Sequence, residues 1–389
     1  MGHLSNRLER MPRSGVREIF DMARAVPDLV HLEIGEPDFS MPTHITEAAI
    51  QALRDGFTRY TPNAGLEELR EAISEKLKRE NEIDADPSGE ILVTAGSMEA
   101  LSLSALSTIN ENDEVVIPDP GYVSYEAEVL LAGGIPVPVP LREENDFGLK
   151  MDDIEKVVTK KTRLLIMNYP SNPTGAVIRR EDLKEIADFV TDRDILVLSD
   201  EPYERLVYPG NRHYSIAALP GMLEHTISVF SFSKTYAMTG MRIGYAVSGK
   251  ELIRQMTKMQ EHYVACVNTV AQKAAVAALR GPQTCVEAML KEYTRRRDAV
   301  IEGLSKIKMM TCRKPAGAFY AFPNISKSGQ DSKTFGTSLL KEAKVATVPG
   351  AAFGRRGEGH IRLSFATSVQ NIREAIRRIA EYCAKTFPE

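Results

Sequence analysis

Short apolar runs alternate with amphipathic segments between about residues 90 and 247, and this alternation restricts the fold more than any other feature of the sequence. The apolar runs read ILVTAG, EVVIPDP, RLLIMNYP, DILVLSDEPY and TISVFSFSK. Between two of them, a predicted helix carries on one face the side chains of Leu183, Ile186, Ala187 and Val190. Strands that alternate with helices are typical of a mostly parallel sheet covered by helices on both faces, so the sequence predicts an α/β fold.

Prolines and glycines divide the chain on either side of this region. A proline-containing segment, LEIGEPDFSMP, precedes it, and a helical run after it stops at Gly281-Pro282. The remaining residues mix short strands with helices, which favours a separate α+β domain. A chain of 389 residues also exceeds the size at which one hydrophobic core stops growing. We therefore predict an N-terminal segment (1–45) that packs with a small C-terminal domain (282–389), and a large domain (46–281) between them.

Composition excludes several classes of function. The formal charge of -4 argues against binding to nucleic acid. The four cysteines contain no C-x-x-C pair, which argues against a metal site or a disulfide framework and fits a reducing compartment. Because no stretch approaches eighteen uninterrupted apolar residues, we expect no contact with a membrane and a cytoplasmic location.

The stretch SFSKTYAMTGMRIGY, residues 231–245, places Lys234 between serines. Its first four letters match the S-x-x-K of penicillin-binding acyl enzymes, in which the serine is the nucleophile. They equally suit a lysine that holds an aldehyde cofactor as a Schiff base while nearby hydroxyls bind a phosphate. A solvated lysine in a polar loop is the third reading, and only the rest of the chain can decide among them.

Other polar residues come at the ends of predicted strands, where ligands bind in sheets of this kind. Asp200 ends ILVLSD, with Tyr203 three residues later, and SNPTG supplies Asn172 in a proline-containing turn. Tyr122 follows a further strand and offers an aromatic face for a flat ring. At TAGSMEAL a strand gives way to a helix, so the free N–H groups of the first turn form an anion site; they belong to Ser97, Met98 and Glu99.

Two arginines complete this set. Arg242 stands eight residues after Lys234, close enough to share a phosphate with Ser231. Arg362 lies in the predicted strand HIRLSF, and its apolar neighbours indicate that the guanidinium points into a cleft. A planar guanidinium suits bidentate binding of a substrate carboxylate.

These groups together fit the requirements of pyridoxal phosphate. That cofactor needs an amine for its aldehyde, an acid at its ring nitrogen, donors to its phenolate oxygen, a group that covers the ring, and a phosphate site. The candidates, in that order, are Lys234, Asp200, Tyr203 with Asn172, Tyr122, and Ser97 with Ser231 and Arg242.

The sequence resembles the class I aminotransferases of the fold-type I pyridoxal-phosphate-dependent superfamily, in the subgroup of bacterial and archaeal aspartate and aromatic aminotransferases. The resemblance runs nearly end to end, through IGEPDF, YTPNAGLEELR, SNPTG, SDEPYE, SFSKTYAMTGMRIGY and HIRLSFAT. It implies a large pyridoxal-phosphate-binding domain and ping-pong transamination of an L-amino acid with a 2-oxo acid, with 2-oxoglutarate expected as the acceptor.

The resemblance also implies roles for individual residues. Lys234 would bind the cofactor and then act as general acid and base, Asp200 would pair with the ring nitrogen, and Tyr203 and Asn172 would bond to the phenolate oxygen. The phosphate would be held by Ser97, Ser231, Ser233 and Arg242, by the first turn that includes Met98 and Glu99, and by Tyr60 of the neighbouring subunit. The substrate would meet Arg362 through its α-carboxylate, and also Gly35, Tyr122 and Asn172. Because Tyr60 would serve the other subunit's site, a homodimer is implied.

Two departures from the family pattern concern the substrate. Tyr122 stands where a tryptophan is common, and Met98 stands where aspartate-specific relatives often carry a lysine that meets a second carboxylate. A broad range that includes aromatic or other apolar amino acids is therefore expected, with aspartate and glutamate as further candidates.

Rival functions fit less well. A serine acyl enzyme would need K-T-G and S-D-N elements, which the chain lacks, and GYAVSGKE has the spacing of a phosphate-binding loop but ends in Glu251 instead of a hydroxyl residue. A non-catalytic regulatory protein derived from the same fold would normally have lost at least one of the residues that hold the cofactor, whereas this chain has them all. A pyridoxal-phosphate-dependent carbon–sulfur β-lyase stays open as the alternative.

Overall fold

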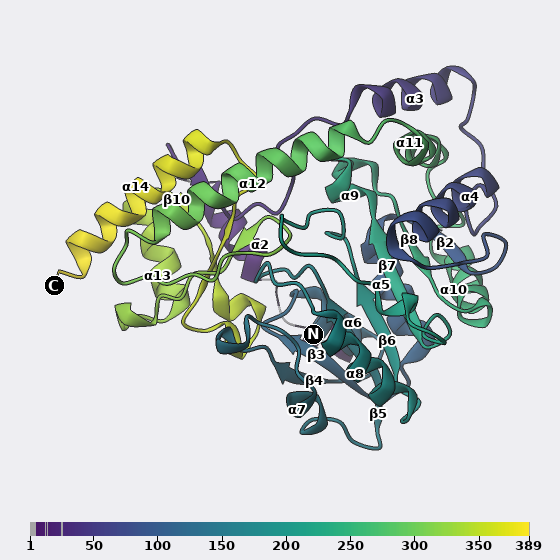
Figure 1. Cartoon of the computed structure of the whole chain (residues 1–389), viewed down its shortest axis with the longest axis horizontal. Helices are drawn as coiled ribbons and strands as arrows, with labels where there is room; N and C mark the ends of the chain where they lie inside the picture. The colour runs from purple at the N-terminus through teal and green to yellow at the C-terminus, as the bar shows by residue number, and fades with distance from the viewer. Residues whose placement is uncertain (1–4, 12, 14, 25, 389) are drawn as a thin grey trace.

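The computed structural model describes residues 5–11, 13, 15–24 and 26–388. Its main element is a seven-stranded sheet (Figure 1). In spatial order the strands are β2 (Ile91–Thr94), β8 (Gly244–Val247), β7 (Thr226–Ser231), β6 (Leu196–Asp200), β5 (Thr162–Asn168), β3 (Glu114–Asp119) and β4 (Ile135–Pro140). Only β8 runs antiparallel to its neighbours among these strands, so the predicted α/β class with a mostly parallel sheet is confirmed.

Side chains of the sheet alternate between two buried faces. On β5, Leu164 and Ile166 pack on one side, and Leu165 and Met167 pack on the other. The first face is covered by α5 (Gly96–Thr108), α6 (Ser124–Leu131) and α10 (Lys250–Tyr263). The second is covered by α4 (Glu67–Lys76), α8 (Arg180–Thr191) and α11 (Thr269–Arg280). A sheet buried on both faces needs nearly continuous apolar strands, which explains runs such as LLIM.

The edge strand β4 contains three prolines, Pro136, Pro138 and Pro140. Proline cannot donate to a neighbouring strand, so it is confined to positions such as this sheet edge. The prolines thereby protect the open edge against pairing with another chain.

A smaller unit lies beside the main sheet. It contains the antiparallel sheet β11 (Val348–Pro349), β12 (Ile361–Ser364) and β9 (Tyr320–Ala321). Around it are α12 (Thr284–Leu304), α13 (Ser332–Ser338) and α14 (Val369–Thr386). Figure 1 shows the long helix α12 running from the main sheet toward α14 and so joining the two parts.

The N-terminal segment pairs with this smaller unit. β1 (Val30–His31) runs parallel to β10 (Val345–Ala346), and the backbone N–H of Ser364 donates to the carbonyl of Leu32 at 2.7 Å. The remaining helices are α1 (Asn6–Arg10), α2 (Gly15–Ala23), α3 (Thr43–Arg54), α7 (Met151–Glu155) and α9 (Phe232–Thr235). The domain boundaries at residues 45 and 281 stay a prediction.

None of the helices in the described part of the chain combines the length and the apolar character that crossing a bilayer requires.

Candidate active site

The predicted site residues gather where β5, β6 and β7 end. Asn168 and Asp200 are paired in register at the last positions of β5 and β6. The Asn168 side chain donates to the Asp200 carbonyl at 2.9 Å, and its Oδ1 accepts from the Asn172 backbone N–H at 2.8 Å. Asn168 thus fixes the turn that carries Asn172 against the strand that carries Asp200.

Asp200 is a buried carboxylate with one side-chain donor. Its Oδ2 accepts a hydrogen bond from the hydroxyl of Tyr125, on α6, at 2.6 Å. No described residue donates to Oδ1, although that atom is also buried. Burial raises the pKa of Asp200 to about 7, the negative charge of Glu201 adds to this rise, and the Tyr125 hydrogen bond opposes it. A cationic N–H group at Oδ1 would supply the missing partner.

Lys234 lies on the single turn α9, directly after β7. The turn begins at Ser231, whose Oγ accepts from the Ser233 backbone N–H at 3.1 Å as an N-cap. The Lys234 amino group donates to the carbonyl of Gly35 at 2.7 Å. Burial lowers the pKa of this amine to about 8, the charges of Arg242 and Arg362 lower it further, and Glu36 opposes them. The lowered pKa leaves roughly a tenth of the amine neutral at pH 7, far more than for an ordinary lysine, and this makes Lys234 a usable nucleophile and base.

The Arg242 side chain packs against the start of α5, where the sequence predicts an anion site. Gly96 has φ +78°, and a Cβ there would lie 2.5 Å from Nη2 of Arg242. A Cβ on Gly244 would lie 2.8 Å from the backbone nitrogen of Ser97. Only glycine fits at both positions, because neighbouring atoms come so close to them. The absence of side chains there lets the Arg242 guanidinium lie beside the free N–H groups at the start of α5.

Glu99 and Met98, which were both predicted to lie at this helix start, make further contacts. One carboxylate oxygen of Glu99 accepts from the Ala95 backbone N–H, and burial raises the pKa of Glu99. The hydroxyl of Tyr122 points to Sδ of Met98 at 3.7 Å, and its ring meets Tyr125 edge-on, with centroids 5.6 Å apart. Met98 and Tyr122 thus form one wall, and Tyr122 also packs against the tyrosine that donates to Asp200.

Arg362 reaches from β12 of the smaller unit to the main sheet. Nη1 donates to Oδ1 of Asn172 at 3.0 Å, and Nη2 donates to the Glu33 carbonyl at 2.7 Å. The guanidinium lies 4.5 Å over the Tyr320 ring and 5.0 Å over that of Phe353. No described residue accepts from its buried Nε. This held, desolvated guanidinium can take a carboxylate.

Tyr203 is buried and shares a 2.8 Å hydrogen bond with the hydroxyl of Tyr320. A Cβ on Gly35 would lie 2.4 Å from that Tyr320 hydroxyl, so only glycine fits there. Gly35 therefore contacts Tyr320 as well as Lys234.

Tyr60 stands apart from this group. Its side chain is 89% exposed, whereas Asp200, Tyr203, Asn172 and Arg362 are all buried. The single chain does not bring Tyr60 to the other predicted site residues.

Sequence reasoning missed Tyr125, Asn168 and Tyr320. Asn168 ends a strand just as Asp200 does, so the strand-end rule could have found it. Tyr125 is a second tyrosine three residues after Tyr122, in the first turn of a helix, and this spacing could have indicated it. Tyr320 sits in the apolar run GAFYAF, where no polar pattern marks it.

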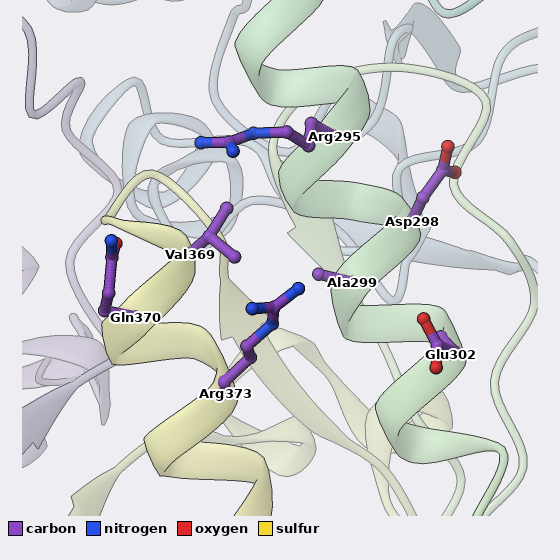
Figure 2. Close-up of a pocket in the computed structure, with 7 residues that line it drawn as sticks. All are labelled: Arg295, Asp298, Ala299, Glu302, Val369, Gln370 and Arg373. Atoms are coloured by element: carbon purple, nitrogen blue, oxygen red, sulfur yellow. The ribbon is translucent and has the colours of Figure 1, made fainter.

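A separate cavity of about 310 Å³ lies between α12 and α14 (Figure 2). Its lining residues are Arg295, Asp298, Ala299, Glu302, Val369, Gln370 and Arg373. It contains none of the predicted site residues, and its charged groups have local partners, such as Glu292 for Arg295 and Lys306 for Glu302. This cavity is therefore not the candidate active site.

Comparisons with known proteins identify similar sequences over almost the whole chain. A sequence model of the family "aminotransferase class I and II" matches residues 27–379. An aromatic-amino-acid aminotransferase of Thermococcus litoralis is 48% identical over 97% of both chains. An aspartate aminotransferase of Pyrococcus abyssi is also 48% identical over 97% of both chains.

Solved structures give the same result. An aromatic aminotransferase from Pyrococcus horikoshii superposes with a TM-score of 0.91 at 48% identity, covering 95% of this chain and 99% of that one. An aspartate aminotransferase from Thermus thermophilus, solved with maleate, gives a TM-score of 0.93 at 39% identity, covering 98% and 100%.

Proposed function

The chain belongs to the class I and II aminotransferases, whose members use pyridoxal phosphate, and we propose that it transfers amino groups from aspartate or aromatic L-amino acids to a 2-oxo acid. The expected acceptor is 2-oxoglutarate. The observation that carries the proposal is the convergence of a partly buried amine, Lys234, with a buried carboxylate, Asp200, and a held guanidinium, Arg362.

The residues present fit the cofactor. Oδ1 of Asp200 is a buried acceptor in need of a donor, which a protonated ring nitrogen supplies. The Arg242 guanidinium packs against Gly96 beside the free N–H groups at the start of α5, and this pairing of donors suits a phosphate. We assign Lys234 to the aldehyde, and Tyr203 with Asn172 to the phenolate oxygen. Ser231 and Ser233 would assist at the phosphate, and the Tyr122 ring would cover the pyridine.

When bound, the pyridoxal ring accepts the electron pair left by the broken Cα–H bond of the substrate. The chain's own residues then have three tasks. Asp200 would keep its charge beside the ring nitrogen, Lys234 would take the proton from the substrate Cα and deliver it to the aldehyde-derived carbon C4′ of the cofactor, and Arg362 would hold the α-carboxylate so that the Cα–H bond faces Lys234. Positioned proton transfer of this kind contributes about 10²–10⁴-fold to the rate.

The substrate side chain would meet the wall of Met98 and Tyr122. Their contact presents a thioether and an aromatic ring, which suit apolar or aromatic side chains and offer no charge to a second carboxylate. We therefore propose a broad range in which aromatic substrates are favoured and dicarboxylates are accepted less well.

We propose a homodimer with shared sites. Large apolar side chains are exposed at Leu53 and Phe57, shortly before Tyr60 in the sequence, and at Tyr263 and Val264, shortly before Cys266, whose Sγ accepts from the Thr61 backbone N–H. Such a surface suits contact with a second copy, which would receive Tyr60 at its phosphate site. Mixing Tyr60→Ala with Lys234→Ala protein should restore up to about a quarter of the activity, because hybrid dimers contain one intact site. No recovery in proven hybrids would refute the sharing.

An acceptor assay tests the function. With phenylalanine or aspartate as donor, product should form only when 2-oxoglutarate is present, in a one-to-one ratio with glutamate. A β-lyase would instead release ammonia and pyruvate from a cysteine conjugate without any acceptor, and that result would replace the proposal.

A further inference from the structure

Tyr320 joins three parts of the molecule at one hydroxyl. It lies on β9 of the smaller unit, is 1% exposed, and pairs in register with Ser364 of β12. Its hydroxyl is 2.8 Å from that of Tyr203, which belongs to the larger part of the chain. The backbone of Gly35 closes the remaining side of this hydroxyl. A hydroxyl so enclosed has few orientations open to it.

The Tyr203 ring is fixed by aromatic neighbours as well. Phe319 meets it edge-on with centroids 5.3 Å apart, and Tyr320 meets it at 5.7 Å and 83°. Since the ring cannot swing away, the direction of its single O–H proton is decided by which of the two tyrosines donates in the shared hydrogen bond.

The neighbouring charge favours Tyr320 as the donor. The Arg362 guanidinium lies 4.5 Å over the Tyr320 ring, and a cation there makes the phenolic proton more acidic. Between two hydroxyls, the more acidic one is the better donor. Burial raises the pKa of both tyrosines and Arg362 opposes the rise in both, whereas the hydrogen bond between them raises the pKa of Tyr203 and lowers that of Tyr320.

We propose that Tyr320 is a positioning residue that donates its proton to Tyr203 and so leaves the Tyr203 proton free to point into the site. This inference rests on the proposed function, in which Tyr203 donates to the phenolate oxygen of the cofactor. A Tyr203 that accepts from Tyr320 is the stronger donor on its other side, because hydrogen bonds in a chain reinforce one another. Tyr320 thereby stabilises the anionic oxygen without touching it.

The pH titration of the visible absorption of cofactor-loaded protein tests this role directly. A stabilised phenolate lowers the pH midpoint of the spectral change, so Tyr320→Phe should raise that midpoint by about half to one pH unit, as expected for one lost hydrogen bond. Tyr208→Phe is the matched control, because the buried Tyr208 hydroxyl donates only to the Ala318 carbonyl. Its midpoint should stay at that of the parent.

A double variant of Tyr203 and Tyr320 shows whether Tyr320 acts through its hydrogen bond to Tyr203 or through a general loss of packing. If Tyr320 acts only through Tyr203, then Tyr203→Phe raises the midpoint further than Tyr320→Phe, and adding Tyr320→Phe to Tyr203→Phe changes nothing more. If the shifts of the two single variants add in the double variant, the inference is wrong. It is also wrong if Tyr203→Phe shifts the midpoint but Tyr320→Phe leaves it equal to that of Tyr208→Phe. A parent protein with no visible band after reconstitution would overturn the proposed function itself.

Discussion

The hydroxyl of Tyr125 lies 2.6 Å from Oδ2 of Asp200, and Oδ1 of the same carboxylate receives no donor from the described residues. A buried carboxylate with half of its capacity unused is costly to ionise, and the pKa of Asp200 rises accordingly, to about 7. The fold thus holds a buried carboxylate whose Oδ1 gains a hydrogen-bond donor only when a cationic partner binds in the site.

Tyr125→Phe should weaken that charge. The ring stays, but the hydrogen bond that opposes the rise in the pKa of Asp200 is lost. A hydrogen bond to a charged group is worth about 1.5–3 kcal/mol, so single-turnover transfer from the amino acid should slow by about 10- to 100-fold. Tyr208→Phe is again the control, and a Tyr125→Phe rate equal to that control would remove Tyr125 from the mechanism.

Asp200→Asn should have opposite effects on stability and on catalysis. Burial raises the pKa of Asp200 from 3.8 to about 7, so the folded state holds a proton that the unfolded chain releases. The stability that the protonated Asp200 gives to the folded state is therefore lost as the pH rises through about 7. At pH 8 the cofactor-free variant should be more stable than the parent, by on the order of 2–4 kcal/mol, and at pH 3 the two should agree.

The same variant should retain the cofactor but lose most of the half-reaction rate, since the charge beside the ring nitrogen is gone. Urea unfolding at the two pH values and single-turnover rates measure both effects. Asp146→Asn, at an exposed carboxylate, controls for a general change in charge. Transamination by Asp200→Asn within a few-fold of the parent would show that Asp200 lacks this role.

Sequence patterns predicted the sheet, and they predicted for physical reasons that most of the candidate site residues would gather at one edge of it. Asp200 ends a strand, and Lys234 and Asn172 follow strands within a few residues, so a parallel sheet brings all three to one edge whatever the details of packing. Tyr320 could not be predicted in this way, because its hydroxyl becomes functional only through the register of β9 with β12 and the close approach of Gly35. The role proposed for Tyr60 depends on a second chain, and no pattern within one chain reveals contacts of that kind.

Arg362→Lys should separate charge from geometry. Lysine keeps the positive charge but cannot donate to Asn172, to the Glu33 carbonyl and to a carboxylate in the same plane. We expect kcat/KM to fall by about 10²-fold or more, mostly through KM for both amino and oxo acids. Arg295→Lys, on the exposed side of α12, is the matched control. An unchanged KM would mean that the carboxylate binds elsewhere.

Met98→Lys tests which residue selects the side chain. Measured with 2-oxoglutarate, kcat/KM for aspartate should rise relative to phenylalanine by about tenfold, because a lysine there offers a charge to the second carboxylate. Tyrosine and leucine should follow phenylalanine. If the parent already prefers aspartate by about a hundredfold and the lysine changes nothing, Met98 does not set specificity.

The account depends most directly on Lys234 as the covalent anchor of pyridoxal phosphate. Its amine is partly buried, is held 2.7 Å from the Gly35 carbonyl, and has a pKa lowered to about 8. The decisive measurement is reduction of the reconstituted protein with borohydride, followed by peptide mapping. We predict one pyridoxyl group per chain, on Lys234, and none in Lys234→Ala. A pyridoxyl group on another lysine, or a protein that binds no cofactor, would contradict the account.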